Sequence, residues 1–136
     1  MTHYIGILDG HDDVWGVRIP DLPGCLGGGS SPEVAIRDAV SAMAEWVQDR
    51  QDRGHPVPQP RSAGDLMRDP AIRADMLPGD AFVVLPLIVE SGRPTRANIS
   101  LDAGLLQSID MAAKARGLTR SAFLASAARE KILAEV

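Results

Sequence analysis

The chain has 136 residues and a net charge of −4 at neutral pH; 45% of its residues are hydrophobic and 24% are charged. This balance allows a packed core in one ordinary domain or two small ones, and it excludes global disorder. Aromatic residues make up only 4%, so an aromatic surface that stacks on single-stranded nucleic acid is not expected.

Cysteine content and hydropathy narrow the class of protein further. The single cysteine, Cys25, excludes an internal disulfide and a cysteine-rich zinc site. No basic segment followed by an apolar run opens the chain, so we expect no secretory signal. The longest apolar stretch, 81–89, contains Pro86 and is far shorter than the ~20 residues of a membrane helix. We therefore expect a cytoplasmic protein without a membrane partner.

The charges are distributed unevenly along the chain. Residues 1–91 contain seven Arg and no Lys against fourteen Asp plus Glu, a balance of −7. Residues 92–136 contain seven Lys plus Arg against four acidic residues, a balance of +3. A basic part can contact phosphates, whereas an acidic part repels them and can receive a basic protein. The asymmetry indicates two partners of different character.

Two short strands are predicted at the start of the chain. Residues 4–8 and 15–19 are β-rich, and the turn-forming run 9–13 joins them as a hairpin. The segment 20–29 can add a third short strand or an irregular crossing. Its glycine triplet, 27–29, is expected to let the backbone turn into the next helix; it is no phosphate loop, because no Lys-Ser/Thr pair follows it.

A long helix is predicted next, with Ser30 or Ser31 as its cap and an end near Arg53, where Gly54 stops it. Apolar residues recur at helical spacing and define one buried face. The members of this face are Ile36, Ala39, Val40, Met43, Trp46 and Val47.

The middle of the chain is less regular. Alternating prolines make 56–60 an extended loop, and a short helical turn is predicted around 63–68. A strand is predicted within 81–90, apolar on both faces, and Pro86 favours an edge or a bulge for it. The best linker candidate is 91–94.

The last third begins with a predicted strand, because residues 96–101 alternate strictly between polar and apolar side chains. Ala97, Ile99 and Leu101 share one face. Two helices follow, the first capped by Asp102 and stopped by Gly117, the second capped by Thr119. Their inward positions are Leu105, Leu106, Ile109, Ala112 and Ala113, then Phe123, Leu124, Ala127, Ala128 and Ile132.

A lone strand in so small a unit leaves its backbone groups unpaired. Two copies solve this together, since their strands can pair antiparallel about a two-fold axis under four helices. We therefore predict an obligate homodimer through the C-terminal strand, whose stability depends on concentration. Pairing of dimers into tetramers is left open.

A two-stranded ribbon of this kind fits the major groove of double-stranded DNA. On its polar face, Arg96 can donate two hydrogen bonds to guanine, Asn98 can exchange two with adenine, and Ser100 can reach either base. The alternative is that this is simply the solvent-facing side of a strand. Free amides at the start of the second helix make a predicted phosphate clamp, formed by Thr119, Arg120 and Ser121.

These C-terminal residues, 96–101, 105–114 and 117–124, resemble ribbon-helix-helix repressors of the Arc and MetJ type. With Pro20-Asp21-Leu22-Pro23-Gly24 and the helix from Ser30 to Val47 included, nearly the whole chain resembles the HicB antitoxins. The resemblance implies a degenerate ribonuclease H-like N-terminal domain. We therefore predict an α+β fold with a toxin-neutralising domain in 1–90 and a ribbon-helix-helix domain in 93–136.

The resemblance implies an antitoxin that neutralises a small basic HicA-type ribonuclease by direct binding and represses its own operon by binding operator DNA. Many HicB proteins end in a helix-turn-helix, so here the alternating residues 96–101 decide for a ribbon. The alternative is a stand-alone ribbon-helix-helix repressor whose N-terminal domain senses a small ligand. An enzyme with an appended DNA-binding tail ranks third.

The toxin-binding surface is predicted on the acidic flank of the first helix and around the second strand, with Trp15, Asp21, Glu45 and Asp49 as its residues. No catalytic residue, cofactor or metal ligand is predicted. Three of the four N-terminal aspartates that could suggest a nuclease lie in the predicted turn 9–13, which favours aspartate for backbone reasons. The histidines lack metal-like spacing, and Cys25 has no basic neighbour to activate it.

Overall fold

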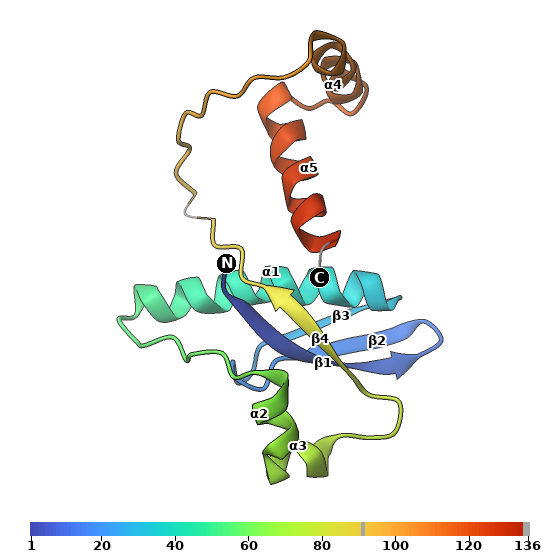
Figure 1. Cartoon of the computed structure of the whole chain (residues 1–136), viewed down its shortest axis with the longest axis vertical. Helices are drawn as coiled ribbons and strands as arrows, with labels where there is room; N and C mark the ends of the chain where they lie inside the picture. Colours follow the sequence, from blue (N-terminus) through green and yellow to red (C-terminus); the bar gives the residue numbers. More distant parts are fainter. Residues whose placement is uncertain (91, 135–136) are drawn as a thin grey trace. The chain divides into compact units, whose positions relative to one another are not determined.

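The computed structural model describes residues 1–90 and 92–134, and the chain divides beside Gly92 into two compact units (Figure 1). The predicted linker 91–94 includes this division, but its first position lies outside the described residues, as do positions 135 and 136. The first unit combines an antiparallel sheet with helices, and the second is helical. The predicted α+β class is therefore confirmed.

A four-stranded antiparallel sheet organises the first unit, in the order β3-β2-β1-β4. The predicted hairpin is formed by β1 (His3–His11) and β2 (Val14–Arg18), with the turn at residues 12–13. Asp9 therefore lies inside β1, opposite Gly16, and its prediction as a turn residue is wrong. The outer strands are β3 (Leu26–Gly29) and β4 (Ala81–Pro86), and β4 has the predicted edge position.

The long helix α1 (Pro32–Asp52) packs along one face of this sheet (Figure 1). Its predicted cap is confirmed, because Ser31 Oγ accepts a hydrogen bond from the Val34 amide at 3.2 Å. Trp46 is only half-buried and donates its indole N–H to the Pro23 carbonyl at 3.1 Å, so its prediction as a core residue is wrong. The buried face of α1 consists of Ala35, Ala39, Val40, Met43 and Val47.

The glycine triplet forms strand β3 and lets α1 approach the sheet closely, so its prediction as a turn into the helix is wrong. A Cβ added at Gly27 would lie 2.6 Å from Ala39 Cα and 2.7 Å from Ala39 Cβ. Gly28 differs, since a Cβ there would meet nothing closer than the Trp15 carbonyl oxygen at 3.5 Å. One glycine is thus required by packing, whereas its neighbour has room for a methyl group.

Two short helices lie on the other side of the sheet (Figure 1). The predicted helical turn is α2 (Ala63–Arg68), and Ser62 and Asp65 satisfy its first amides as a capping box. The second, α3 (Pro70–Asp75), was not predicted, although Asp69 caps it through the Ala71 amide at 2.9 Å and Pro70 suits its first turn. Its few residues contain too short an apolar pattern to indicate a helix.

Cys25 belongs to the core of this unit. The thiol is free and buried, and burial raises its pKa to about 11. Little thiolate therefore exists at neutral pH, which agrees with the sequence interpretation of an idle thiol.

The second unit contains α4 (Ala103–Ala115) and α5 (Arg120–Ala134), both predicted. Asp102 Oδ1 caps α4 through the Leu105 amide at 3.0 Å, and Thr119 Oγ1 caps α5 through the Ala122 amide at 3.1 Å. Gly117 takes the left-handed conformation, with φ at 68°, that the predicted stop requires. None of the described helices could span a membrane.

The predicted strand 96–101 is absent from the single chain, where residues 93–102 have no regular secondary structure. A strand is held by hydrogen bonds to a neighbouring strand, and no strand occurs among the described residues of this unit. The alternating pattern is therefore present without the partner that would make it a strand.

Gly27→Ala should lower the free energy of unfolding by about 1–3 kcal/mol, because the new methyl group overpacks against the backbone of α1. Gly28→Ala is the matched control and should cost nothing measurable, since its methyl group has space. Denaturant unfolding of the two variants measures the difference. Equal stability of both would contradict the close packing of β3 against α1.

Candidate functional site

The second unit exposes large apolar side chains that its own fold does not cover. Ile99 is 63% exposed and Leu105 is 51% exposed, while Leu101 between them is also exposed. Among the described residues of this unit only Ile109 and Ala113 are buried. Two buried residues are a very small core for a stable unit, so this apolar surface is suited to a second protein surface.

A hollow of about 290 Å³ lies between residues 97–101 and the two helices. It brings together three of the predicted DNA contacts, because Asn98, Arg120 and Ser121 all line it. The other lining residues are apolar: Ala97, Ile99, Leu101, Leu106 and Leu124. The remaining predicted contacts, Arg96, Ser100 and Thr119, are exposed but are not part of this lining.

Arg120 is held by an acidic residue that the sequence analysis missed. Its Nε and Nη2 donate to the two carboxylate oxygens of Asp110 at 2.9 and 2.8 Å. The hydrogen bonds lower the pKa of Asp110 and raise the pKa of Arg120. This bidentate geometry anchors the start of α5 to α4. A phosphate that reaches Arg120 therefore has to compete with the Asp110 carboxylate.

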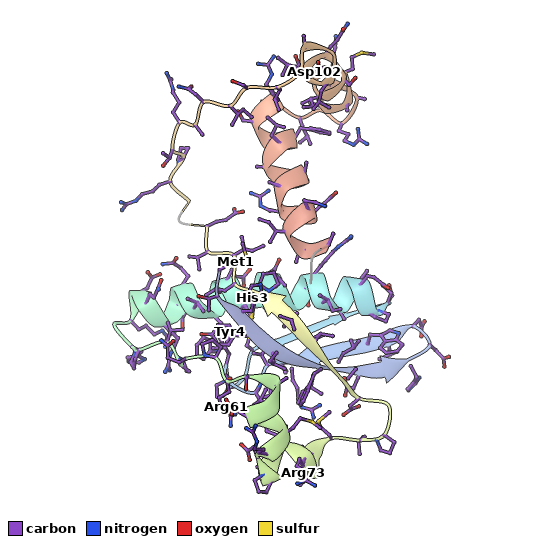
Figure 2. All side chains as sticks on the ribbon, in the orientation of Figure 1. Met1, His3, Tyr4, Arg61, Arg73 and Asp102 are labelled. Atoms are coloured by element: carbon purple, nitrogen blue, oxygen red, sulfur yellow. The ribbon has the colours of Figure 1, made fainter. Side chains whose placement is uncertain are left out.

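In the first unit, the predicted toxin contact Asp21 is bonded within the chain, and its role toward a toxin stays a prediction. Its carboxylate is only 7% exposed and accepts from the Arg61 amide and from Arg61 Nε, both at 2.7 Å. Arg61 Nη1 also donates to Asp69 at 2.9 Å, and Figure 2 shows Arg61 beside the start of α2. Asp21 therefore fixes the loop after β2 to the segment that leads into α2.

The other predicted toxin contacts do not form a cluster with Asp21. Trp15 is half-buried on β2 and donates its indole N–H to the Asp12 carbonyl at 3.0 Å. Glu45 and Asp49 are exposed on α1, and Asp49 pairs with Arg53 at 3.0 Å. Among the described residues no hydrogen bond or ion pair joins any two of the four, and no group of three His, Cys, Asp or Glu residues is placed to hold a metal ion.

The sequence profile of a family described as the HicB-like antitoxins of bacterial toxin–antitoxin systems matches residues 3–128. This chain belongs to that family. The match spans both units, so it does not rest on the helical tail alone. HicB-like antitoxins are regulatory proteins and not enzymes.

Solved structures of HicB proteins agree with this assignment. Antitoxin HicB of Burkholderia pseudomallei is 26% identical, with a TM-score of 0.56 over 94% of this chain and 96% of that one. The structure of antitoxin HicB3 is 25% identical, with a TM-score of 0.52 over 96% of this chain and 98% of that one. A chain of the HicA3–HicB3 toxin–antitoxin complex shares the fold at 19% identity, with a TM-score of 0.51 over 62% of this chain and 96% of that one. No curated protein matches significantly.

If this chain binds DNA and Arg120 contacts phosphate, Asp110→Asn should lower the Kd for a DNA duplex, because the guanidinium is released from its carboxylate partner. We expect log Kd to change with log salt more steeply, by about 0.9 for each added phosphate contact. Fluorescence anisotropy titrations at several salt concentrations measure this slope.

Glu130→Gln is the matched control. Like Asp110→Asn it removes one negative charge, but Glu130 lies on α5 and is not part of the Asp110–Arg120 pair. An identical gain in DNA affinity in both variants would show that the gain comes from the change in net charge alone. No gain in either would argue against Arg120 as a phosphate contact.

Proposed function

We propose that this HicB-like antitoxin neutralises a small basic HicA-type ribonuclease by direct binding, and that it represses its own operon as a DNA-bound homodimer in the cytoplasm. The observation that carries the proposal is the family match over residues 3–128. The charge asymmetry supports the division of roles, because residues 1–91 carry −7 and residues 92–136 carry +3. The acidic unit would cover the toxin, and the basic unit would meet the DNA.

Dimerisation is supported by the uncovered apolar face of the second unit. Ala97, Ile99 and Leu101 alternate along a segment that lacks a strand partner, and Leu105 extends the apolar surface onto α4. A second copy would supply both the hydrogen-bonding partner and the cover for these side chains. The ribbon-helix-helix assignment rests on this complementarity. The likeness of the first unit to half a ribonuclease H also stays a prediction.

DNA binding is supported by the polar residues that alternate with this apolar face. Arg96, Asn98 and Ser100 are exposed, and pairing of two segments would place both sets of three on one side of a ribbon. Ser121 follows the capping residue of α5, where free amides can bind phosphate. Sequence specificity would come from the ribbon, and orientation from the start of α5.

The alternative, a repressor whose first unit senses a small ligand, has less support. The hollow lined by Ile7, Arg18, Cys25 and Ile72 measures about 250 Å³, which is smaller than the ~300–1,000 Å³ of ordinary ligand pockets. Arg18 lies within 4 Å of the carboxylates of Asp9 and Asp80, so its charge is already balanced.

Toxin neutralisation is tested by co-expression with a small basic HicA-type ribonuclease. Induction of that protein alone should arrest growth, and co-expression of the full chain should restore it. Residues 1–91 carry the acidic charge, so deletion of the second unit should leave some neutralisation, measured as colony counts. Continued growth arrest with the full chain present would refute the antitoxin role toward that protein.

Asn98→Ala should weaken operator binding by about 10- to 100-fold, because each bidentate contact to adenine contributes roughly 1–3 kcal/mol of discrimination. The dimer should persist, since Asn98 lies on the polar face. Gel-shift titration measures affinity, and analytical ultracentrifugation measures mass. Gln107→Ala, an exposed polar truncation on α4, is the control and should leave affinity unchanged. Unchanged affinity of Asn98→Ala would remove the groove-reading role.

A further inference from the structure

The two edge strands of the sheet in the first unit differ in the hydrogen bonds of their outward backbone groups. At the β3 edge, the outward amide of Gly28 donates to Asp38 Oδ2 of α1 at 2.9 Å. A side chain of the same unit therefore occupies the outward donor of Gly28, which a neighbouring strand could otherwise use. At the opposite edge, β4 has no such cover among the described residues.

The register of β4 shows which of its backbone groups are free. Leu87 N–H donates to the Thr2 carbonyl at 2.8 Å, which makes this a hydrogen-bonded pair of the antiparallel ladder. Such pairs alternate, so Phe82 and Val84 direct their N–H and C=O groups away from β1. Within the part of the chain that the structure describes, none of these four groups has a hydrogen-bond partner.

The side chains of β4 do not protect this edge either. From Ala81 to Leu85 the strand contains neither a charged residue nor a proline, and Pro86 appears only at its end. Val84 is 45% exposed. Native proteins usually blunt an apolar edge strand with a lysine, a proline or a bulge, because an open edge pairs with other chains. An edge with free outward groups and no such protection is suited to pairing with a strand of another chain.

The negative charge of the first unit indicates which kind of protein binds the free edge of β4. A second copy would bring together two units that each carry −7, whereas a basic protein would meet opposite charge. We propose that the basic toxin adds an edge strand of its own to β4 and extends the sheet by one strand. This inference rests on the proposed toxin neutralisation and assigns it to main-chain hydrogen bonds of Phe82 and Val84.

Val84→Pro tests the proposal, because proline removes one outward donor without breaking a hydrogen bond to β1. Its affinity for a small basic HicA-type ribonuclease should fall about 10- to 100-fold, through the lost bond and the bulk of the ring. Val84→Thr keeps the amide and the branched shape, so it should bind like the wild type. Isothermal titration of the full-length variants measures both.

Hydrogen exchange on the wild-type chain gives a second measurement that needs no variant. The amides of Phe82 and Val84 should exchange rapidly in the free antitoxin and become protected in the complex. Those of Ala81 and Val83, which bond to β1, should be protected in both states.

The possible outcomes distinguish failure of the β4 edge proposal from failure of the proposed toxin neutralisation. Full binding by Val84→Pro, with both outward amides unprotected in the complex, would overturn the edge proposal and leave toxin neutralisation intact. Val84→Pro that binds the toxin normally but lowers the mass of the free chain would assign the edge to a second copy. Failure of the wild-type chain to bind would refute the proposed function itself.

Discussion

The fold depends on one constraint, which is that every backbone N–H and C=O in a strand needs a partner. In the first unit, β1 pairs with β2 and β4, β2 pairs with β1 and β3, and Asp38 accepts the outward amide of Gly28 in β3. In the second unit, residues 96–101 cannot meet it within one chain. Both proposed interfaces, the dimer ribbon and the toxin-binding edge, lie where the constraint is left unmet.

Local chemistry made much of the fold predictable. Serine, aspartate and threonine caps located α1, α4 and α5, because capping depends on residues only two or three positions apart. The hairpin was predictable for the same reason. The role of the glycine triplet was not, since only the packing of Ala39 against Gly27 shows why that position of β3 is a glycine. Trp46 matched the helical period of the core but lies at its margin.

The candidate site was predictable where it follows alternation and unpredictable where it depends on distant partners. Asn98 and Ser121 line one hollow, as a shared site requires, although they are far apart in the sequence. Nothing in the spacing indicated that Arg120 would pair with Asp110, or that Asp21 would pair with Arg61, forty positions away. The sequence around a single charged residue does not indicate its ion-pair partner, whereas a periodic apolar pattern does indicate which residues share a face.

The Arg61 guanidinium has a consequence for the internal motions of the first unit. It joins Asp21, in the loop after β2, to Asp69, which begins α3, while Tyr4 ties the approach to α2 through the Pro58 carbonyl. Segments linked in this way open together or not at all. The loop and the two short helices should therefore behave as a single cooperative foldon, so that a disturbance at one helix is transmitted to the loop.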